Sequence, residues 1–184
     1  MGVAALTRAA VLLDRDGVLN RAFSEGDATR PPRSLDEVEI LPGVPEALAR
    51  LAAAGLALVG VSNQPDVPRG HTTRAVVEAI NAYLVAQLGL LAIVTCFHDD
   101  ADACACRKPQ PGLLLDAARR FDLDLARSVM VGDRWSDVAA GQAAGCRTVL
   151  IETPYSHAER CTPDARAADL AQTTALVLRW QASG

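Results

Sequence analysis

The stretch VLLDRDGVLN, residues 11–20, is the most informative part of this sequence. Its apolar run ends at two aspartates, Asp14 and Asp16, and the chain then turns at Gly17. A short apolar run bounded by turn residues is typical of a buried strand in a parallel sheet. In open α/β sheets, ligands bind beyond the carboxyl ends of the strands. The stretch therefore predicts a strand that presents two carboxylates to a functional site.

The rest of the chain alternates short apolar runs with longer helical segments, the pattern of a parallel sheet covered by helices on both faces. We predict a Rossmann-like, doubly wound, three-layer α/β fold. Residues 24–39 are rich in proline and charge, lack a sustained period and are predicted to form a loop or flap. The predicted strands are residues 9–14, 56–62, 93–97, 128–131 and 147–151, and the predicted helices are 44–54, 72–88, 111–121, 136–144 and 165–180.

Length and composition limit the classes of function. The chain has 184 residues, half of them apolar, so residues 1–184 are predicted to form a single domain. The net charge of -4 argues against binding to nucleic acid or to an anionic membrane surface. No apolar segment is long enough to span a bilayer. We expect a cytoplasmic monomer that acts on a small molecule.

Further polar groups follow the other predicted strands. Ser62 ends the second strand, and the segment GDRWSD, with Asp133 and Asp137, follows the fourth. Several carboxylates in one crevice would repel each other, and Mg²⁺, which prefers oxygen ligands, would relieve that repulsion. Lys108, the sole lysine among 18 basic residues, and Ser62 supply the charge and the hydroxyl that a phosphoryl group needs.

The motifs D-x-D-G-V-L-N, V-S-N, R-K-P and G-D-x-x-x-D occur in this order, and the sequence therefore resembles the haloacid dehalogenase (HAD) superfamily of aspartate-nucleophile phosphatases. The resemblance implies that Asp14 attacks phosphorus and that Asp16 is the general acid and base. It implies Mg²⁺ bound by Asp14, the backbone carbonyl of Asp16 and Asp133, with Asp137 in support. A single D-x-D-G or G-D-x-x-x-D motif is also common in turns, calcium loops and helix N-termini, but four in order are far more specific.

The same resemblance assigns roles to the remaining motif residues. Ser62 and nearby backbone N–H groups are expected to bind the phosphoryl oxygens. Lys108 is expected to neutralise charge between the nucleophile and the phosphate.

A second motif, CFHDDADACACRKP, contains three cysteines and a histidine: Cys96, His98, Cys104 and Cys106. This set suits tetrahedral zinc, and four protein ligands leave no open position for a reacting water. On the residues alone, ordinary buried or exposed thiols remain an alternative. Together with R-K-P-x-P-G and S-N-Q, the pattern resembles the heptose 1,7-bisphosphate phosphatases and the related histidinol-phosphate phosphatases. In that group the zinc is structural, and here it would hold the loop that carries Arg107 and Lys108.

The motif spacing leaves no room for a folded cap domain, so loops are predicted to form the walls of the pocket. These are residues 21–33, residues 63–71 and the zinc loop. Arg107 is the predicted contact for the phosphate or a second anionic group, and Asn63 and Arg69 are further predicted substrate contacts. Pro65 and Asp66 replace the small residues usual in the family, at a place in the pocket wall where substrate specificity is decided.

These features predict a Mg²⁺-dependent phosphatase that removes the C7 phosphate of heptose 1,7-bisphosphate. Histidinol phosphate is the alternative substrate. A phospho-acceptor signalling domain is an alternative of another class, but an acid–base at Asp16 would shorten the life of an aspartyl-phosphate. A nucleic-acid end-processing phosphatase is disfavoured because the chain is acidic and lacks an aromatic-rich basic groove.

Overall fold

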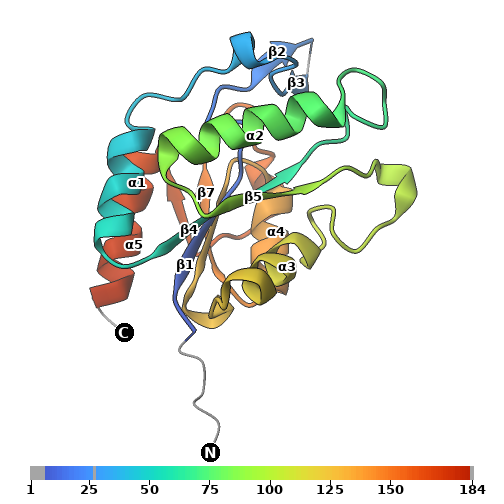
Figure 1. The fold of residues 1–184 in the computed structure, drawn as a ribbon. Helices are drawn as coiled ribbons and strands as arrows, with labels where there is room; N and C mark the ends of the chain where they lie inside the picture. The colour runs from blue at the N-terminus through green and yellow to red at the C-terminus, as the bar shows by residue number, and fades with distance from the viewer. Residues whose placement is uncertain (1–6, 27, 183–184) are drawn as a thin grey trace, which may run out of the picture.

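The structure, a computed structural model, describes residues 7–26 and 28–182. Its main feature is a six-stranded parallel sheet with the strand order β5-β4-β1-β6-β7-β8 (Figure 1). The strands are β1 (Ala10–Leu13), β4 (Ala57–Asn63), β5 (Ala92–Cys96), β6 (Val129–Gly132), β7 (Arg147–Ile151) and β8 (Ala165–Ala167).

Helices cover both faces of this sheet (Figure 1). One layer contains the helices whose buried residues pack with Val11 and Leu13, and the other contains those that pack with Ala10 and Leu12. The first layer is α1 (Val44–Ala53), α2 (Arg74–Leu88) and α5 (Leu170–Ala182), and the second is α3 (Gly112–Phe121) and α4 (Trp135–Ala143). The predicted three-layer α/β fold is confirmed.

The central strand β1 shows why its sequence is a continuous apolar run. Successive side chains of a strand point to opposite faces, and here both faces are covered by helices. All four residues of β1 are fully buried, two in each layer of the core. A polar residue is tolerated only after the strand has left the core, and Asp14 is that residue.

The strand order reverses between β1 and β6. The chain moves outward from β1 through β4 to β5, and later from β6 through β7 to β8. Neighbouring loops then diverge at the carboxyl ends of β1 and β6, which leaves a crevice at this switch point. Asp14 follows β1 and Asp133 follows β6, so the sheet brings these carboxylates together.

The sequence prediction was wrong at the start of the last helix. Residues 165–180 were expected to be one helix, whereas residues 165–167 form β8 and α5 begins at Leu170. The Asp164 carboxylate accepts hydrogen bonds from the backbone N–H and the hydroxyl of Thr148 on β7, at 2.7 and 2.8 Å. This contact aligns residues 165–167 with the edge of β7, where strand pairing outweighs the helical propensity of two alanines.

The segment after β1 is more ordered than a loop. Residues 24–39 were predicted to form a loop or flap, and the structure has an antiparallel hairpin of β2 (Phe23–Glu25) and β3 (Ala28–Arg30), followed by the 3-10 helix η1 (Leu35–Glu37). Arg30 stacks on the ring of Phe23 and pairs with Glu37 at 2.7 Å. These contacts hold the hairpin, called the flap below, above the carboxyl end of the sheet (Figure 1).

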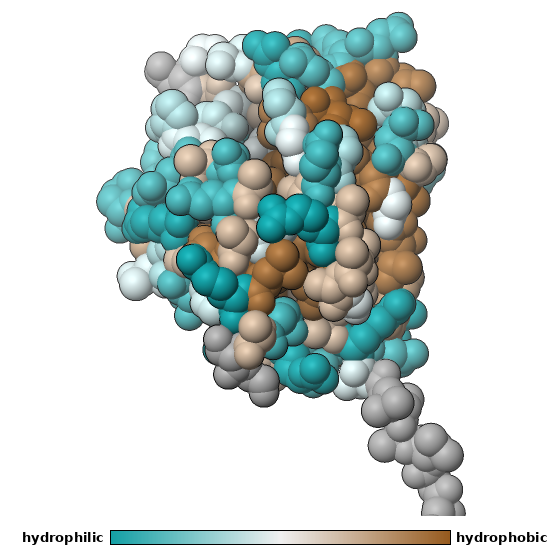
Figure 2. All heavy atoms as spheres, turned by 90° about the vertical axis from the view of Figure 1, so that its left-hand side faces the viewer, coloured by the Kyte–Doolittle hydropathy of each residue, from teal (hydrophilic) through white to brown (hydrophobic). Residues whose placement is uncertain are grey.

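Figure 2 views the molecule from the side of α1 and α5, where hydrophilic and hydrophobic patches alternate. Within residues 7–26 and 28–182, no helix combines the length and the apolar character that crossing a membrane requires.

Candidate active site

Lys108 forms the centre of the site. Its Nζ lies 2.7 Å from Asp14 Oδ1 and 2.6 Å from Asp137 Oδ1, and it donates to the carbonyl of Val61 at 2.8 Å. Lys108 is only 4 % exposed, and a buried ammonium requires such partners. Burial opposes the charge, but Asp137 and Asp14 outweigh it and raise the pKa of Lys108 above its ordinary value. The lysine is therefore a fixed positive charge beside the Asp14 carboxylate.

Asp133 is the third carboxylate of the cluster. One ligand atom from each of Asp14, Asp133 and Asp137 lies within 4.8 Å of the others, and all three residues are buried. Neither oxygen of Asp133 has a well-formed hydrogen bond among the described residues, although the Tyr155 hydroxyl lies nearby. Buried carboxylate oxygens without partners are costly. The donor set and the unsatisfied oxygens fit a hard divalent cation such as Mg²⁺.

The pKa values of this cluster reflect the same crowding. Burial, opposed by Lys108 and reinforced by Asp137, raises the pKa of Asp14 to about 6. Burial and the charges of Asp14 and Asp137 raise the pKa of Asp133 well above its ordinary value. Lys108 pairs with two of the three carboxylates, and Arg134 offsets the raised pKa of Asp133 only in part, so full ionisation of the cluster requires a further positive charge.

Gly17 allows the loop after β1 to lie directly against Asp133. Its φ is +96°, which side chains rarely adopt, and a Cβ there would lie 2.0 Å from Asp133 Oδ2. The glycine of the D-x-D-G motif therefore lets the loop after β1 approach the loop after β6.

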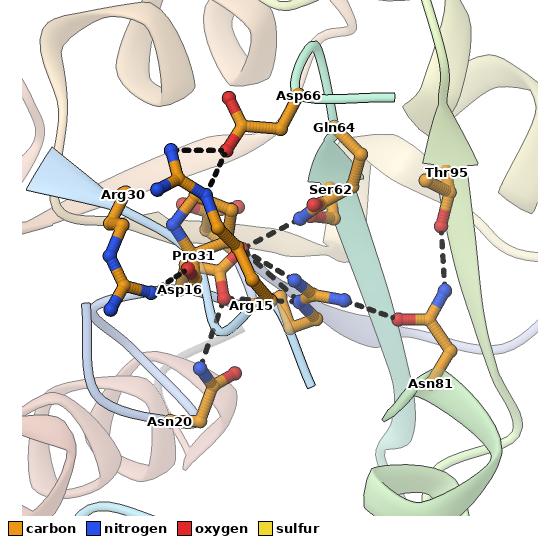
Figure 3. A network of polar contacts seen from close by, with 12 residues as sticks. Arg15, Asp16, Asn20, Arg30, Pro31, Ser62, Gln64, Asp66, Asn81 and Thr95 are labelled. Atoms are coloured by element: carbon orange, nitrogen blue, oxygen red, sulfur yellow. Dashed lines mark hydrogen bonds and ion pairs between the residues drawn. The ribbon is translucent and has the colours of Figure 1, made fainter. Parts of the chain in front are cut away.

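Asp16 points into a separate set of hydrogen-bond donors (Figure 3). Its carboxylate accepts from Gln64 Nε2 at 2.7 Å, from Asn20 Nδ2 at 2.9 Å, and from Nε and Nη2 of Arg15 at 3.0–3.2 Å. Gln64 Nε2 also donates to Ser62 Oγ at 2.9 Å. The two aspartates of the motif thus have different environments: Asp14 lies in a carboxylate cluster beside Lys108, and Asp16 accepts hydrogen bonds from Arg15, Asn20 and Gln64. The role of the Asp16 backbone carbonyl as a metal ligand stays a prediction.

Sequence reasoning missed the partners of Asp16. Arg15 is fully buried although it lies between two aspartates, and Gln64 is fully buried at the end of β4. Arg15 Nη1 donates to Asn81 Oδ1 on α2 at 2.9 Å. The motif D-R-D gave no sign that the arginine turns inward, because an arginine at such a position is usually solvated. Asn81, a polar residue on the apolar face of a helix, was the one signal available.

A cavity of about 400 Å³ opens above these groups. Its walls come from the flap, from residues 63–69, from the loop of residues 97–111 between β5 and α3, called the Cys/His loop below, and from the start of α4. The prediction that loops form the pocket is therefore confirmed, and the flap and α4 add Arg30 and Arg134 to its lining. Arg134 donates to the hydroxyl of Thr29 and stacks 5.5 Å from the ring centroid of Tyr155, which connects α4 to the flap.

The three predicted substrate contacts differ in their availability. Arg107 Nε pairs with Asp100 at 2.8 Å, but its buried Nη1 has no partner among the described residues and remains able to bind an anion. Arg69 pairs with Asp99 and Asp100 of the Cys/His loop. Asn63 exchanges two hydrogen bonds with the backbone of Lys108, at 3.0 and 3.1 Å. In this structure Arg69 and Asn63 brace the Cys/His loop, and their contact with substrate stays a prediction.

The flap is tied to the wall after β4. Arg33 pairs with Glu25 at 3.0 Å and with Asp66 at 3.4 Å, and His71 Nδ1 lies 3.4 Å from the same Asp66 carboxylate. Asp66 is 7 % exposed and lines the cavity, at a position that departs from the family pattern. Arg33 therefore connects β2 of the flap to the wall of the cavity that follows β4.

The Cys/His cluster is assembled as predicted. Cys96 Sγ, His98 Nδ1, Cys104 Sγ and Cys106 Sγ all lie within 4.8 Å of one another, and individual separations run from 3.2 to 3.7 Å. Ligands about 2.3 Å from a tetrahedral zinc would be roughly 3.8 Å apart, whereas a disulfide requires about 2 Å. All described cysteines are free. The donor set and spacing fit zinc.

The thiols of this cluster cannot all ionise without a cation. Burial raises the pKa of Cys104, but hydrogen bonds from the backbone of Arg107 and from Cys106 outweigh it and lower the value to about 7. Burial and the neighbouring sulfurs Cys96 and Cys104 raise the pKa of Cys106 to about 12. A bound zinc ion would reverse that trend for Cys106, since a coordinating thiol is deprotonated.

The geometry agrees with comparisons to known proteins. A family model described as "HAD-hyrolase-like" matches residues 105–175. The D-glycero-beta-D-manno-heptose-1,7-bisphosphate 7-phosphatase of Bordetella bronchiseptica is 41% identical over 148 residues, which cover 78% of this chain and 80% of that protein. The enzyme of the same name from Pseudomonas aeruginosa is 38% identical over 153 residues, 80% of this chain and 83% of that protein.

A solved structure extends the similarity to nearly the whole chain. The D,D-heptose 1,7-bisphosphate phosphatase from B. bronchiseptica, complexed with magnesium and phosphate, has a TM-score of 0.79 and 37% identity, covering 93% of this chain and 98% of that one. The four motifs, the carboxylate cluster and these relatives agree. The chain therefore belongs to the HAD-like phosphatases, in the group of the D-glycero-beta-D-manno-heptose-1,7-bisphosphate 7-phosphatases.

Proposed function

We propose that this protein is a Mg²⁺-dependent phosphatase that releases the C7 phosphate of D-glycero-D-manno-heptose 1,7-bisphosphate and leaves heptose 1-phosphate for nucleotide-activated heptose synthesis. The observation that carries the proposal is the cluster of Asp14, Asp133 and Asp137, in which Lys108 contacts Asp14 and Asp137 and neither Asp133 oxygen has a well-formed hydrogen bond among the described residues. The identity of the substrate is inferred from the relatives named as heptose bisphosphate phosphatases.

In the proposed reaction, an oxygen of Asp14 attacks the C7 phosphorus and the bond between phosphorus and the sugar oxygen breaks. Asp16 gives its proton to the leaving alkoxide, and the phosphoryl group remains on Asp14. Asp16, now ionised, takes a proton from a water molecule that attacks the same phosphorus. Phosphate leaves and Asp14 is regenerated.

The charged groups of the site stabilise the phosphoryl group during transfer. Lys108 is preorganised by Asp14, Asp137 and Val61, so it needs no reorganisation when negative charge develops on the phosphoryl oxygens. Ser62 supplies a hydroxyl donor. Mg²⁺, held by Asp14 and Asp133 with Asp137 in support, would neutralise the phosphoryl oxygens and the carboxylate cluster.

We further propose that the Cys/His cluster binds a structural zinc ion. A zinc ion bound there would close the loop next to Arg107. The Nη1 of Arg107, which has no partner among the described residues, would then bind an anionic group of the substrate. Zinc binding by three thiolates favours a reducing compartment, so a cytoplasmic location is part of the proposal. A monomeric state is a separate part of it.

The test is Mg²⁺-dependent phosphate release from a panel of substrates: both anomers of heptose 1,7-bisphosphate, histidinol phosphate, fructose 1,6-bisphosphate and a 3′-phosphorylated oligonucleotide. We expect one heptose anomer to exceed the others by about 100-fold in kcat/KM, or about 3 kcal/mol of transition-state discrimination. A preference for histidinol phosphate would keep the chemistry and replace the substrate. A persistent aspartyl-phosphate without turnover would favour the phospho-acceptor alternative. An inactive Asp14→Asn variant is the control for the nucleophile.

A further inference from the structure

A buried row of polar side chains connects Asp16 to strand β5 (Figure 3). Arg15 donates to both oxygens of Asp16 through Nε and to Oδ2 through Nη2, and it donates to Asn81 Oδ1 through Nη1 at 2.9 Å. Asn81 Nδ2 donates in turn to Thr95 Oγ1 at 2.9 Å. The row thus begins in the loop after β1, crosses α2 and ends on β5.

Arg15 is held at both ends. Its side chain has no exposed surface, and a guanidinium buried in this way must keep its hydrogen-bond partners. The planar fork of an arginine fixes the directions of its donors, so the position of Asn81 determines the direction in which Nε and Nη2 point. Thr95 fixes the Asn81 amide because it accepts from Nδ2 and leaves Oδ1 facing Arg15.

The other two partners of Asp16 do not reach as far. Asn20 donates otherwise to the carbonyl of Arg21 beside it, and Gln64 donates otherwise to Ser62. Among the three side chains that contact the Asp16 carboxylate, Arg15 is therefore the one that connects it to α2 and β5. These two elements belong to the rigid core, where Asn81 is 9 % exposed and its neighbours Ile80 and Leu84 are fully buried.

We propose that Arg15 and Asn81 are positioning residues for proton transfer: Asn81, fixed by Thr95, orients Arg15, and Arg15 holds the Asp16 carboxyl within reach of the leaving-group oxygen. The inference rests on the proposed function, because it takes Asp16 as the proton donor. A general acid must lie within hydrogen-bond distance of its target, and a small displacement far from the reacting atoms lowers the rate strongly.

The leaving group provides a test that a purely structural role would not pass. A sugar alkoxide needs a proton from Asp16 as it departs, whereas p-nitrophenolate leaves as a stable anion and needs little help. The ratio of kcat/KM for heptose 1,7-bisphosphate to kcat/KM for p-nitrophenyl phosphate therefore measures proton donation. Because kcat/KM reports the steps up to the first irreversible one, the later hydrolysis of the aspartyl-phosphate does not enter the ratio.

The variants are Asn81→Ala, which removes the acceptor of Arg15, and Asn81→Asp, which keeps that acceptor and whose second oxygen can accept from the Thr95 hydroxyl in place of the lost amide donor. Both leave Arg15 and Asp16 in place, so they disturb the core less than an Arg15 substitution would. We expect Asn81→Ala to lower the ratio by about tenfold or more, and Asn81→Asp to stay within about threefold of the wild type. Thr174→Val, which removes a buried hydroxyl on α5, is the matched control, and circular dichroism melting confirms that each variant is folded.

An unchanged ratio in folded Asn81→Ala, whether both kcat/KM values fall in parallel or neither falls, would overturn the positioning role. Failure of the proposed function has a different signature, because the wild-type protein would then release phosphate from neither ester. That result would overturn the inference together with the function on which it rests.

Discussion

The Nζ of Lys108 lies 2.7 Å from Oδ1 of Asp14, with both groups buried at the carboxyl ends of the central strands. The lysine thereby has two functions. It balances carboxylates that the fold has removed from water, and it sits beside the proposed nucleophile, where negative charge accumulates during phosphoryl transfer. Stability and activity consequently depend on the same side chain.

Lys108→Met should lower both the stability of the protein and its phosphatase activity. Removal of one partner from a buried ion pair leaves uncompensated charge, so we expect the free energy of unfolding in the absence of metal to fall by about 3–5 kcal/mol. Phosphate release should fall by at least about 100-fold. Urea denaturation and steady-state kinetics measure the two effects. Arg119→Met, on an exposed ion pair of α3, is the control, and an equal loss in both variants would contradict the role of Lys108.

The raised pKa of Asp14 predicts how Mg²⁺ binding depends on pH. A carboxyl whose pKa rises from 3.8 to about 6 on folding takes up a proton, so its favourable contribution to folding is present below 3.8 and lost as the pH rises through about 6. Mg²⁺ binds the ionised carboxylate, so its contribution to the stability of the folded protein grows as the pH rises. The rise in Tm caused by Mg²⁺ should therefore be small at about pH 5 and larger at about pH 8. A rise that is independent of pH would contradict this assignment.

The Cys/His cluster predicts one zinc ion per chain. Cys104→Ser should lower the zinc content, the Tm and the phosphatase activity together, because the loop that carries Arg107 and Lys108 loses its closure. Cys161→Ser is the matched control, since Cys161 lies outside the cluster. Metal analysis of the two purified variants decides the matter, and equal zinc content in both would exclude this site.

Much of the fold could be predicted because the patterns that indicate its strands and its helices are local in the sequence. The apolar runs of β1 and β6 and the helices between them follow directly from hydrophobic periodicity. β8 could not be predicted, because its three residues have no pattern of their own and are placed by their pairing with β7 and by the contact of Asp164 with Thr148. The β2–β3 hairpin was missed for a similar reason: besides its own short ladder, it is held by the contacts of Arg30 with Phe23 and Glu37, which no periodic pattern records.

The site divides in the same way. Asp14, Lys108 and Asp133 occur in motifs whose order along the chain is informative, so their convergence could be predicted. Arg15, Asn81 and Thr95 are 66 and 14 residues apart along the chain, and their contacts follow from the packing of α2 on β5. No short motif records such a contact. The ion pair of Arg69 with Asp99 likewise could be identified only from the three-dimensional structure, since the sequence around an arginine at a loop end does not indicate its partner.

Arg107 should contribute to substrate binding through its free Nη1. Arg107→Ala is expected to lower kcat/KM for heptose 1,7-bisphosphate by about 10–100-fold, the size of one or two hydrogen bonds to a charged group. Arg69→Ala removes a nearby arginine whose guanidinium is already engaged by Asp99 and Asp100, so its effect should be clearly smaller. An Arg69→Ala variant that loses as much as Arg107→Ala would place Arg69 in direct contact with substrate.

Asp133→Asn should separate stability from function. In the metal-free protein the Asp133 carboxylate is buried, has no well-formed hydrogen bond among the described residues, and faces two further carboxylates. An uncharged amide removes that repulsion, so the metal-free variant should be more stable than the wild type by on the order of 1–3 kcal/mol. The same change removes a metal ligand, so Mg²⁺ should no longer raise the Tm, and phosphate release should be lost. Thermal denaturation with and without Mg²⁺ tests both halves. A variant that is less stable without metal would mean that Asp133 is held by the protein itself, and its unsatisfied oxygens would no longer argue for a cation.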